Sequence, residues 1–194
     1  MTENEQIKTN SLKAWLLATR PKTLAGAAVP VMIGVTLALK ATGWQHFRLV
    51  PAILCFLFAF LMQIDSNLIN DYFDFRHGND DPATRLGPKR ACSEGWITPR
   101  AMAVGLVIVS ALACAVGLPL IWYGGWQMTI VGLTCVLFAF LYTTFFSYKG
   151  LGDVLVLVFF GIVPVCFTYH VIIPEALRVM SWQVLAISIG CGLV

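Results

Sequence analysis

Long apolar runs separated by short polar breaks form the dominant pattern of this chain. The stretch from Ala101 to Tyr148 extends over 48 residues without one Asp, Glu, Lys, Arg or His. That length is enough for two membrane-spanning helices joined by a turn, because about 20 apolar residues cross a bilayer as a helix. We predict helical spans at 23–39, from about 51 onward, at 101–122, at 128–145 and at 154–173, with a sixth beginning near 182.

The polar breaks predict how these spans are connected. Ser11 can cap a short helix over 12–19, in which Trp15 suits the membrane interface. The longest polar segment, 76–97, contains several Gly and Pro residues that break regular structure, so we expect a loop there. Gly34 in the first span predicts close packing against a neighbouring helix. The other predicted breaks are a loop at 40–48, a turn at 123–126 and a polar break at 147–153.

Composition fixes the class of protein. Hydrophobic residues make up 58% of the chain and charged residues 12%, and the mean hydropathy is +0.79, which excludes an ordinary soluble domain. We therefore predict an all-α fold, a polytopic transmembrane helical bundle forming a single domain in a lipid bilayer, with no nucleic acid as partner. The six cysteines have no metal-binding spacing and predict no disulfide framework.

The basic residues predict the orientation in the membrane. If the N-terminus is cytoplasmic, ten basic residues fall on the cytoplasmic side and three on the other, as the positive-inside rule requires. The expected cytoplasmic residues are Lys8, Lys13, Arg20, Lys22, Arg76, Arg85, Lys89, Arg90, Arg100 and Lys149, and the other three are Lys40, Arg48 and Arg178. The N-terminus and the polar stretch described next would then share the cytoplasmic face of a membrane such as the bacterial inner membrane.

One polar stretch, 63–81, carries the candidate chemistry, with five carboxylates and four amides within nineteen residues. Spacings of three and four residues share one face of a helix, and this stretch has such a stripe. The stripe consists of Gln63, Asn67, Asn70, Asp71 and Asp74. Asp71 and Asp74 would repel each other by about 3 kcal/mol at an effective dielectric of about 20. A cation relieves such repulsion, and oxygen ligands select a hard ion such as Mg²⁺.

A solvated helix end that carries its charges in water is the alternative explanation of this stripe, and placement decides between the two. Asn70 lies 19 residues after Pro51, or about 29 Å along a helix at 1.5 Å per residue. The acidic stripe therefore emerges where the hydrocarbon ends, on the same side as the basic loops. Acidic groups that hold a metal, facing Arg and Lys that bind oxyanions, would form a site for a metal-bound diphosphate.

At these residues the chain resembles the UbiA superfamily of intramembrane prenyltransferases. The string from Gln63 to Asp74 is similar to the motif Q-x-x-x-N-x-x-N-D-Y-x-D of the branch that prenylates 1,4-dihydroxy-2-naphthoate, in which a further Asp follows a glycine. Gly78 and Asp80 fill those last two places. Three other motifs match the branch in the same order, and the resemblance covers nearly all of 11–194. They are Arg20-Pro21-Lys22-Thr23, Arg85-Leu86-Gly87-Pro88-Lys89-Arg90 and Gly150-Leu151-Gly152-Asp153.

The resemblance implies an enzyme of menaquinone biosynthesis that transfers a polyprenyl group from polyprenyl diphosphate to 1,4-dihydroxy-2-naphthoate with decarboxylation, giving demethylmenaquinone. Mg²⁺ would be held by Asn70, Asp71, Asp74 and Asp80, with Asn67 orienting these ligands. Basic residues would neutralise the leaving diphosphate as its C–O bond breaks. Those residues would be Arg85, Arg90, Lys149 and Lys22, and Asp71, Asp74 and Lys149 are the expected catalytic residues.

Two departures from the family pattern affect these expectations. Phe145 stands four residues before Lys149, where the family has a tyrosine, so the aromatic position is left to Tyr142 or Tyr148. The family also has a second aspartate-rich motif at the end of its sixth helix, and this chain stops before that point. We therefore expect the chain to be the N-terminal part of a protein of about nine helices, and to be inactive by itself.

Other functions remain open from the sequence. A prenyltransferase for 4-hydroxybenzoate or another acceptor would use the same motifs, and a cation transporter could use carboxylates within the membrane. Asp65 lies away from the stripe and well inside its span, where we expect a structural hydrogen bond to a neighbouring helix or a protonated acid. Asp153 opens the fifth span, where a carboxylate suits a helix N-terminus, and a role in the site is also open.

Overall fold

The computed structural model describes residues 7–78, 89–141 and 152–193. All the regular structure in these ranges is helical, which confirms the predicted fold class. The helices are α1 (Leu12–Ala18), α2 (Leu24–His46), α3 (Leu49–His77), α4 (Pro99–Gly117), α5 (Leu120–Gly124), α6 (Gln127–Leu141), α7 (Gly152–Val156), α8 (Val163–Ile172) and α9 (Trp182–Gly192). Short 3₁₀ turns η1 (Pro21–Thr23) and η5 (Glu175–Leu177) and a π-helical segment η4 (Leu157–Ile162) complete them.

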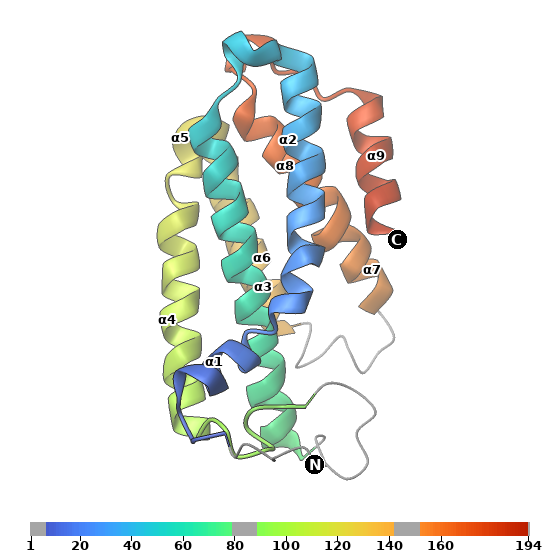
Figure 1. The fold of residues 1–194 in the computed structure, drawn as a ribbon. Coiled ribbons are helices and arrows are strands. Elements are labelled where there is room, and N and C mark those ends of the chain that lie inside the picture. The colour runs from blue at the N-terminus through green and yellow to red at the C-terminus, as the bar shows by residue number, and fades with distance from the viewer. Residues whose placement is uncertain (1–6, 79–88, 142–151, 194) are drawn as a thin grey trace, which may run out of the picture.

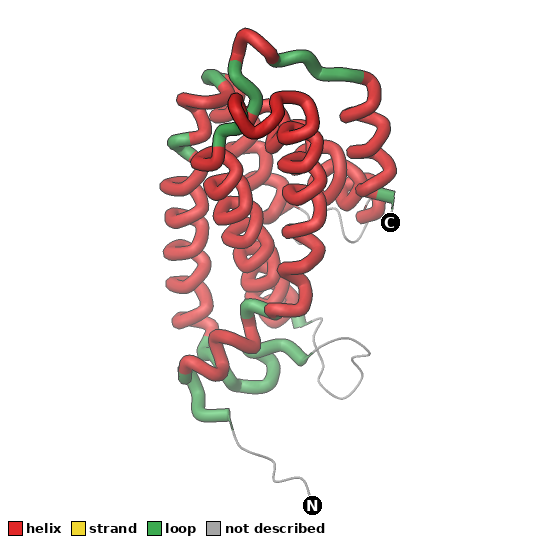
Figure 2. The backbone as a smooth tube through the Cα atoms, turned by 45° about the horizontal axis from the view of Figure 1, so that its top comes forward, coloured by secondary structure: helices red, strands yellow, loops and turns green. Residues whose placement is uncertain are grey.

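The long helices run up and down a single bundle (Figure 1). Four segments are long and apolar enough to cross a membrane, at Leu12–His46, Leu49–His77, Pro99–Gly124 and Asp153–Ile172. α1 crosses the lower end of the bundle, and the connections gather at its two ends (Figures 1 and 2). The described basic residues divide between these ends as predicted, and the assignment of one end to the cytoplasm stays a prediction.

The loop predicted at 40–48 is mostly helix. α2 continues through Lys40 to His46, with one non-helical residue, Gly43, at φ 64°. The hydroxyl of Thr42 donates to the carbonyl of Ala38 at 2.9 Å, so the last turns stay hydrogen-bonded before that kink. Only Phe47 and Arg48 separate α2 from α3. The prediction was wrong because polar residues can continue a helix beyond the hydrocarbon, where water solvates them.

The loop predicted at 76–97 begins later than expected. α3 continues to His77 and ends at Gly78, whose φ of 69° is the left-handed conformation that closes many helices. α3 therefore has 29 residues and is about 43 Å long at 1.5 Å per residue, which exceeds the hydrocarbon thickness of about 30 Å. Its last turns carry the acidic stripe out of the apolar layer.

Two of the predicted spans are interrupted in the structure. α4 ends at Gly117 and the separate helix α5 follows, so the span predicted at 101–122 has a break near Pro119. The span predicted at 154–173 consists of α7, η4 and α8. In an α-helix the backbone amide at position 164 would donate to the carbonyl of Phe160, but Pro164 has no such hydrogen. The thiol of Cys191 in α9 lies 3.7 Å from that carbonyl and donates to it.

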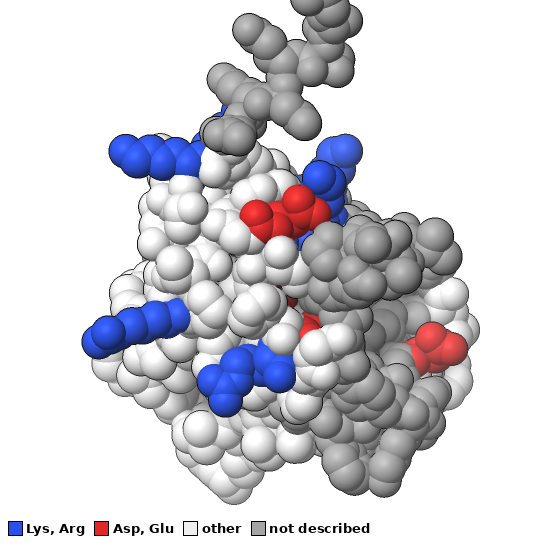
Figure 3. All heavy atoms as spheres, turned by 90° about the horizontal axis from the view of Figure 1, so that it is seen from below, with Lys and Arg blue, Asp and Glu red and all other residues white. Residues whose placement is uncertain are grey.

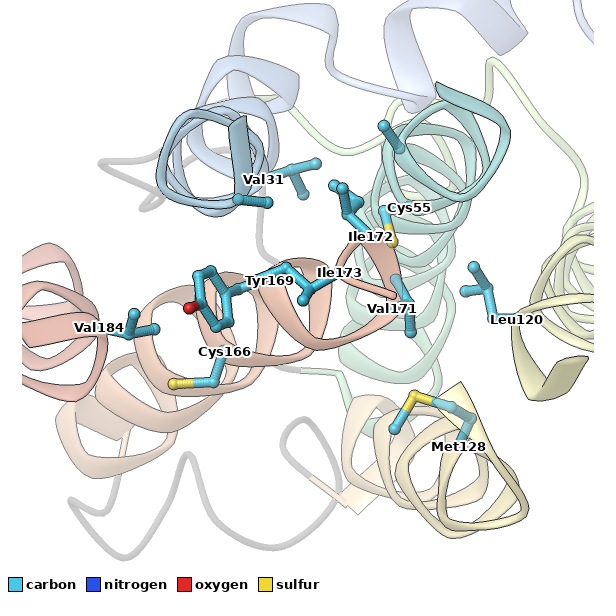
Figure 4. Close-up of a cluster of buried hydrophobic side chains, with 12 residues drawn as sticks. Val31, Cys55, Leu120, Met128, Cys166, Tyr169, Val171, Ile172, Ile173 and Val184 are labelled. Atoms are coloured by element: carbon cyan, nitrogen blue, oxygen red, sulfur yellow. The ribbon is translucent and has the colours of Figure 1, made fainter. Parts of the chain in front are cut away.

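Two clusters of apolar side chains hold the bundle together. The larger one joins α8 to every helix around it, with Tyr169, Val171, Ile172 and Ile173 packed against Val31 of α2, Cys55 of α3, Leu120 of α5, Met128 of α6 and Val184 of α9 (Figure 4). The second cluster lies at the lower end, where α1, the last turns of α3 and α4 meet. Its buried members include Ala14, Leu68, Ile69, Ala91, Cys92, Ile97 and Met102.

Gly34 confirms the predicted close packing of the first span. A Cβ atom on Gly34 of α2 would lie 2.8 Å from both the Cβ of Thr168 and the carbonyl oxygen of Val165 in α8. Without a side chain at this point, the two backbones approach directly, as small residues allow in membrane bundles. α2 and α8 form one wall of the cavity described below.

Candidate functional site

The candidate site is built where the last turns of α3 meet two other segments at the lower end of the bundle. One is the turn η1 between α1 and α2, and the other is the stretch Lys89–Ile97, which we call the docked segment. Figure 3 shows this end of the molecule from below, with acidic side chains near its middle and basic side chains around them. Residues far apart in the sequence therefore surround the acidic stripe.

Asn67 ties α3 to the α1–α2 turn. Its side-chain amide donates to the carbonyl of Thr19 at 3.0 Å and to the hydroxyl of Thr23 at 2.9 Å. The same hydroxyl donates to the carbonyl of Arg20 at 2.9 Å, and Arg20 has a left-handed backbone with φ 51°. Gln63 donates more weakly, at 3.4 Å, to Thr23 and to the carbonyl oxygen of the Asn67 side chain. The buried Asn67 thus fixes the turn that contains the Arg20-Pro21-Lys22-Thr23 motif.

Asp71 faces the docked segment. Its Oδ2 accepts the backbone N–H of Ala91 at 2.7 Å, and its Oδ1 accepts the backbone N–H of Cys92 at 2.9 Å. The side chain is buried, with 1% of the residue exposed. Both oxygens of this carboxylate are therefore engaged with consecutive amides of a segment that lies 20 residues further along the chain.

Asp74, one helical turn after Asp71, pairs with Arg90. The Nη2 of Arg90 lies 2.6 Å from Oδ2 of Asp74, and 8% of the arginine side chain and 21% of the aspartate side chain are exposed. The short distance and limited access to water make this a strong charge-assisted hydrogen bond. The structure thus brings together a carboxylate and a basic residue that the sequence assigned to opposite halves of a metal–diphosphate site.

An apolar cavity of about 490 Å³ opens beside the same helix. Its walls come from all the helices from α2 to α8 and from η4, and they are mostly aliphatic and aromatic side chains such as Val31, Phe58 and Phe167. The polar side chains that α3 contributes to the wall are Gln63, Ser66, Asn67 and Asn70. Gln63, Asn67 and Asn70 thus lie both on the acidic stripe and at the cavity, whereas Asp71 and Asp74 are not part of its wall.

Asp65 makes the structural hydrogen bond that we expected. The hydroxyl of Ser110 in α4 donates to its Oδ2 at 2.9 Å, and Asp65 is completely buried. Its other oxygen, Oδ1, is buried with no hydrogen-bond partner among the described residues. Because Asp65 faces α4 and is not part of the cavity wall, it fastens two helices together outside the site.

The remaining predicted site residues either are exposed or lie outside the described residues. Lys22 is exposed in η1, and no ion pair is found for it among the described residues. Asp153 lies exposed in the first turn of α7, where the helix dipole stabilises a carboxylate. Asp80, Arg85 and Lys149 fall outside the described residues, so their predicted roles stay predictions, and the same holds for Tyr142, Phe145 and Tyr148.

The oxygen donors at the end of α3 fit part of a Mg²⁺ site. Asn70 offers an amide oxygen and Asp74 a carboxylate, which are ligand types that hard cations prefer. Within the described ranges, no three His, Cys, Asp or Glu residues form a group that could hold a metal. A complete ligand set would therefore need oxygen atoms from residues beyond these two, such as the predicted ligand Asp80.

Sequence reasoning missed several partners of the site. The stripe residues bind the backbone amides of Ala91 and Cys92 and the carbonyl of Thr19, and backbone groups leave no pattern in a sequence. They also bind the hydroxyl of Thr23, which the motif at 20–23 contains but whose partner it does not indicate. Burial, together with the nearby Asp71 carboxylate, raises the pKa of the Cys92 thiol above its ordinary value. Cys92 therefore stays a neutral thiol against the acidic stripe.

These features define a class of protein, an integral membrane helical bundle whose apolar cavity reaches a cluster of amides and carboxylates at one end. A family model for UbiA prenyltransferases matches residues 27–194, and the chain belongs to this family. The resemblance seen in the motifs is thereby confirmed.

Curated relatives point to one branch of the family. The chain is 38% identical over 188 residues to the 1,4-dihydroxy-2-naphthoate octaprenyltransferase of Escherichia coli K12, covering 90% of this chain and 58% of that protein. It is 34% identical over 186 residues to the protein of the same name from Mycobacterium leprae, covering 94% and 60%. It is 32% identical over 170 residues to the UbiA prenyltransferase domain-containing protein 1 homolog of Drosophila melanogaster, covering 81% and 45%. The chain thus spans about three fifths of the length of these bacterial relatives.

Proposed function

We propose that the protein containing this chain transfers a polyprenyl group from polyprenyl diphosphate to 1,4-dihydroxy-2-naphthoate, with Mg²⁺ and at the cytoplasmic side of the membrane. The observation that carries the proposal is the joining of two surfaces on α3, since the apolar cavity meets the acidic stripe at Gln63, Asn67 and Asn70. A lipid-like substrate with a charged end needs both surfaces in contact. The names of the bacterial relatives supply the acceptor.

The cavity suits the polyprenyl tail. Its wall is formed by aliphatic and aromatic side chains from most of the helices of the bundle, and a hydrocarbon tail lying there contacts an apolar surface along its length. The amides of Asn67 and Asn70 mark the end at which the diphosphate would lie. Lipid surrounds the bundle, so the substrate can enter from the bilayer in which it dissolves.

The charged end of the substrate would lie between Asn70, Asp74 and Arg90. We propose Asn70, Asp74 and Asp80 as the Mg²⁺ ligands, and Arg85, Arg90, Lys149 and Lys22 as the groups that receive the diphosphate charge. Mg²⁺ bound there would act as a Lewis acid on the diphosphate. Asp71 differs from Asp74 because both of its oxygens already accept backbone hydrogen bonds.

The proposed reaction exchanges one bond for another at the allylic carbon. The C–O bond to diphosphate breaks, and diphosphate leaves with the bonding electrons while the basic residues stabilise its charge. The electron-rich ring carbon that bears the carboxylate attacks the allylic carbon, and the carboxylate then leaves as CO₂. The product is the quinol form of demethylmenaquinone, and no oxidant is needed until the quinol is converted to the quinone.

An assay with two acceptors tests this proposal. Membranes containing the full-length protein would be supplied with octaprenyl diphosphate and either 1,4-dihydroxy-2-naphthoate or 4-hydroxybenzoate, with Mg²⁺ or with EDTA. We expect a prenylated naphthoquinol and released CO₂ only when 1,4-dihydroxy-2-naphthoate and Mg²⁺ are both present. A product from 4-hydroxybenzoate instead would replace the proposed acceptor, and turnover in EDTA would refute the role of the metal.

A matched pair of variants connects the reaction to the site. Asp74→Asn should reduce turnover by about 10²-fold or more, since it removes a charge that both Arg90 and the proposed metal need. Glu175→Gln, which changes an exposed carboxylate in η5 at the opposite end of the bundle, should leave turnover within about twofold. Equal activity in both variants would remove Asp74 from the site.

Cation transport, the alternative from another class of function, finds less support. A transport path requires ionisable groups that follow one another through the membrane interior. Asp65 lies inside its span, but it is bonded to Ser110 on the side of α3 that faces α4, away from the cavity. The carboxylates of Asp71 and Asp74 lie together at one end of the bundle, as a binding site for a headgroup requires.

A further inference from the structure

The carboxylate of Asp71 is bound in a way that sets it apart from the rest of the acidic stripe. Two consecutive backbone N–H groups, from Ala91 and Cys92, donate to its two oxygens at 2.7 and 2.9 Å. Successive amides that converge on an anion form a binding concavity, and hydrogen bonds to a charged acceptor are among the stronger ones. Asp71 is 1% exposed, whereas 21% of the Asp74 side chain is exposed.

The docked segment is a compact unit around these two amides. The carbonyl of Ala91 accepts from the backbone of Trp96 at 2.8 Å and from that of Ile97 at 3.1 Å, which closes the segment into a turn. Ala91, Cys92 and Ile97 are buried in the same apolar cluster as Leu68 and Ile69 of α3. Asp71 is the side chain of α3 that holds the backbone of this turn through both of its oxygens.

Arg90, the residue before the two amides, pairs with Asp74 across the same interface. Asp71 and Asp74 stand three residues apart, so they lie one above the other on α3. Consecutive residues of the docked segment meet them, with Arg90 at Asp74 and Ala91–Cys92 at Asp71. Whatever fixes the backbone at 91 and 92 therefore also fixes where the guanidinium of Arg90 can reach.

We propose that Asp71 is a positioning residue, which fastens the docked segment to α3 and thereby places Arg90 beside Asp74. In this role Asp71 binds protein amides, and the metal is left to the other stripe residues. The anchoring itself does not depend on the reaction, while its effect on diphosphate binding rests on the proposed function. The two roles can be distinguished by substituting Asp71. Loss of an anchor frees the docked segment from α3, whereas loss of a metal ligand leaves the segment in place.

Cys92 reports whether the segment is docked. Its side chain is buried beside Asp71, and modification by N-ethylmaleimide in native membranes requires the segment to open. Asp71→Asn keeps the side-chain volume but points an amide N–H₂ at one of the two backbone donors. Asp71 also raises the pKa of this thiol, so rates are compared at equal thiolate fraction, taken from the pH dependence of modification in each variant. At equal thiolate fraction we expect the rate of Cys92 modification, mapped by peptide mass spectrometry, to rise by about tenfold or more, as the loss of one charge-assisted hydrogen bond predicts.

Asp65→Asn is the matched control. It changes another buried carboxylate of the same helix, six residues before Asp71, and its partner Ser110 lies in α4 rather than in the docked segment. We expect the rate of Cys92 modification in this variant to stay within about twofold of the unchanged protein. Unchanged modification in Asp71→Asn, or an equal rise in both variants, would overturn the proposal. None of these measurements needs substrate, so they hold whichever reaction the protein performs.

A kinetic cycle tests the positioning of Arg90. If Asp71 acts through Arg90, then Asp71→Asn and Arg90→Ala should each raise KM for octaprenyl diphosphate, and the double variant should be little worse than Arg90→Ala alone. The Mg²⁺ concentration for half-maximal activity should stay within about twofold in Asp71→Asn. Additive effects of the two substitutions, or a Mg²⁺ requirement that rises more than about tenfold, would assign Asp71 to the metal and refute the anchor.

Discussion

Replacing Gly34 by alanine should destabilise the bundle, although alanine is the better helix former. The new Cβ would lie 2.8 Å from the carbonyl oxygen of Val165 and from the Cβ of Thr168. A backbone oxygen cannot rotate away, so α2 and α8 would have to move apart. Overpacking of this kind costs about 1–3 kcal/mol, against a gain of roughly 0.5–1 kcal/mol from removing a helical glycine. We expect a net loss of about 1–2 kcal/mol.

Gly26→Ala is the matched control on the same helix. A Cβ atom at Gly26 would meet no heavy atom within 4 Å, so this variant gains helix propensity without the clash. The difference between the two variants should be about 1–3 kcal/mol, or roughly 3–10 °C in Tm for a chain of this size. Thermal unfolding of the purified proteins in one detergent, followed by tryptophan fluorescence, measures the difference. Equal Tm values would show that α2 and α8 do not approach at Gly34 as described.

Three further predictions concern residues near the site. Ser110→Ala should lower Tm, since loss of the donor to buried Asp65 costs about 1–3 kcal/mol; adding Asp65→Leu should recover most of the loss, and a further decrease would contradict the pairing. Cys92 should react with maleimide at least about tenfold more slowly in the folded protein than after unfolding at the same pH, because its raised pKa leaves less of the reactive thiolate. Equal rates would show that Cys92 is not buried. Arg90→Ala should raise KM for the polyprenyl diphosphate by about tenfold or more while KM for the aromatic acceptor changes little, since the guanidinium would bind the oxyanion. An increase confined to the acceptor would place Arg90 on the other substrate.

Hydrophobic patterning was enough to predict the bundle, because the membrane requires long apolar helices. It predicted the start of α9 at Trp182, while the capping residue Ser11 predicted the short helix after it and Pro174 the end of α8. The π-helical segment at Leu157–Ile162 was missed. A run that is apolar on every side shows no hydrophobic periodicity, so a change from α-helix to π-helix leaves no sign in the sequence. Its position depends on Pro164 and on the close approach of Gly161 to α9, which is a tertiary contact.

The site was predictable where it depended on a single helix. Spacings of three and four placed Asn67, Asn70, Asp71 and Asp74 together, and α3 presents them at the expected end of the bundle. The sequence placed Asp74 and Arg90 at one end of the bundle, but it assigned them to the metal and to the diphosphate, and their direct pairing was not predicted. The partners of Asp71 were beyond any side-chain pattern, because they are backbone amides whose direction is set by the turn at 91–97.

We expect the contact between Asn67 and the α1–α2 turn to set the depth of the site in the membrane. α1 crosses the end of the bundle (Figure 1). Its Leu12 and Leu16 are exposed, and its Trp15 packs on Gly105 of α4. A helix with outward leucines and an adjacent tryptophan settles at the boundary between headgroups and acyl chains. Asn67 is hydrogen-bonded to Thr19 and Thr23, which follow α1 in the chain. A position of α1 at the membrane interface would therefore place the polar end of the cavity at the level of the lipid headgroups. A substrate whose tail lies in the bilayer would then meet the amides of α3 at the height where its own diphosphate already lies.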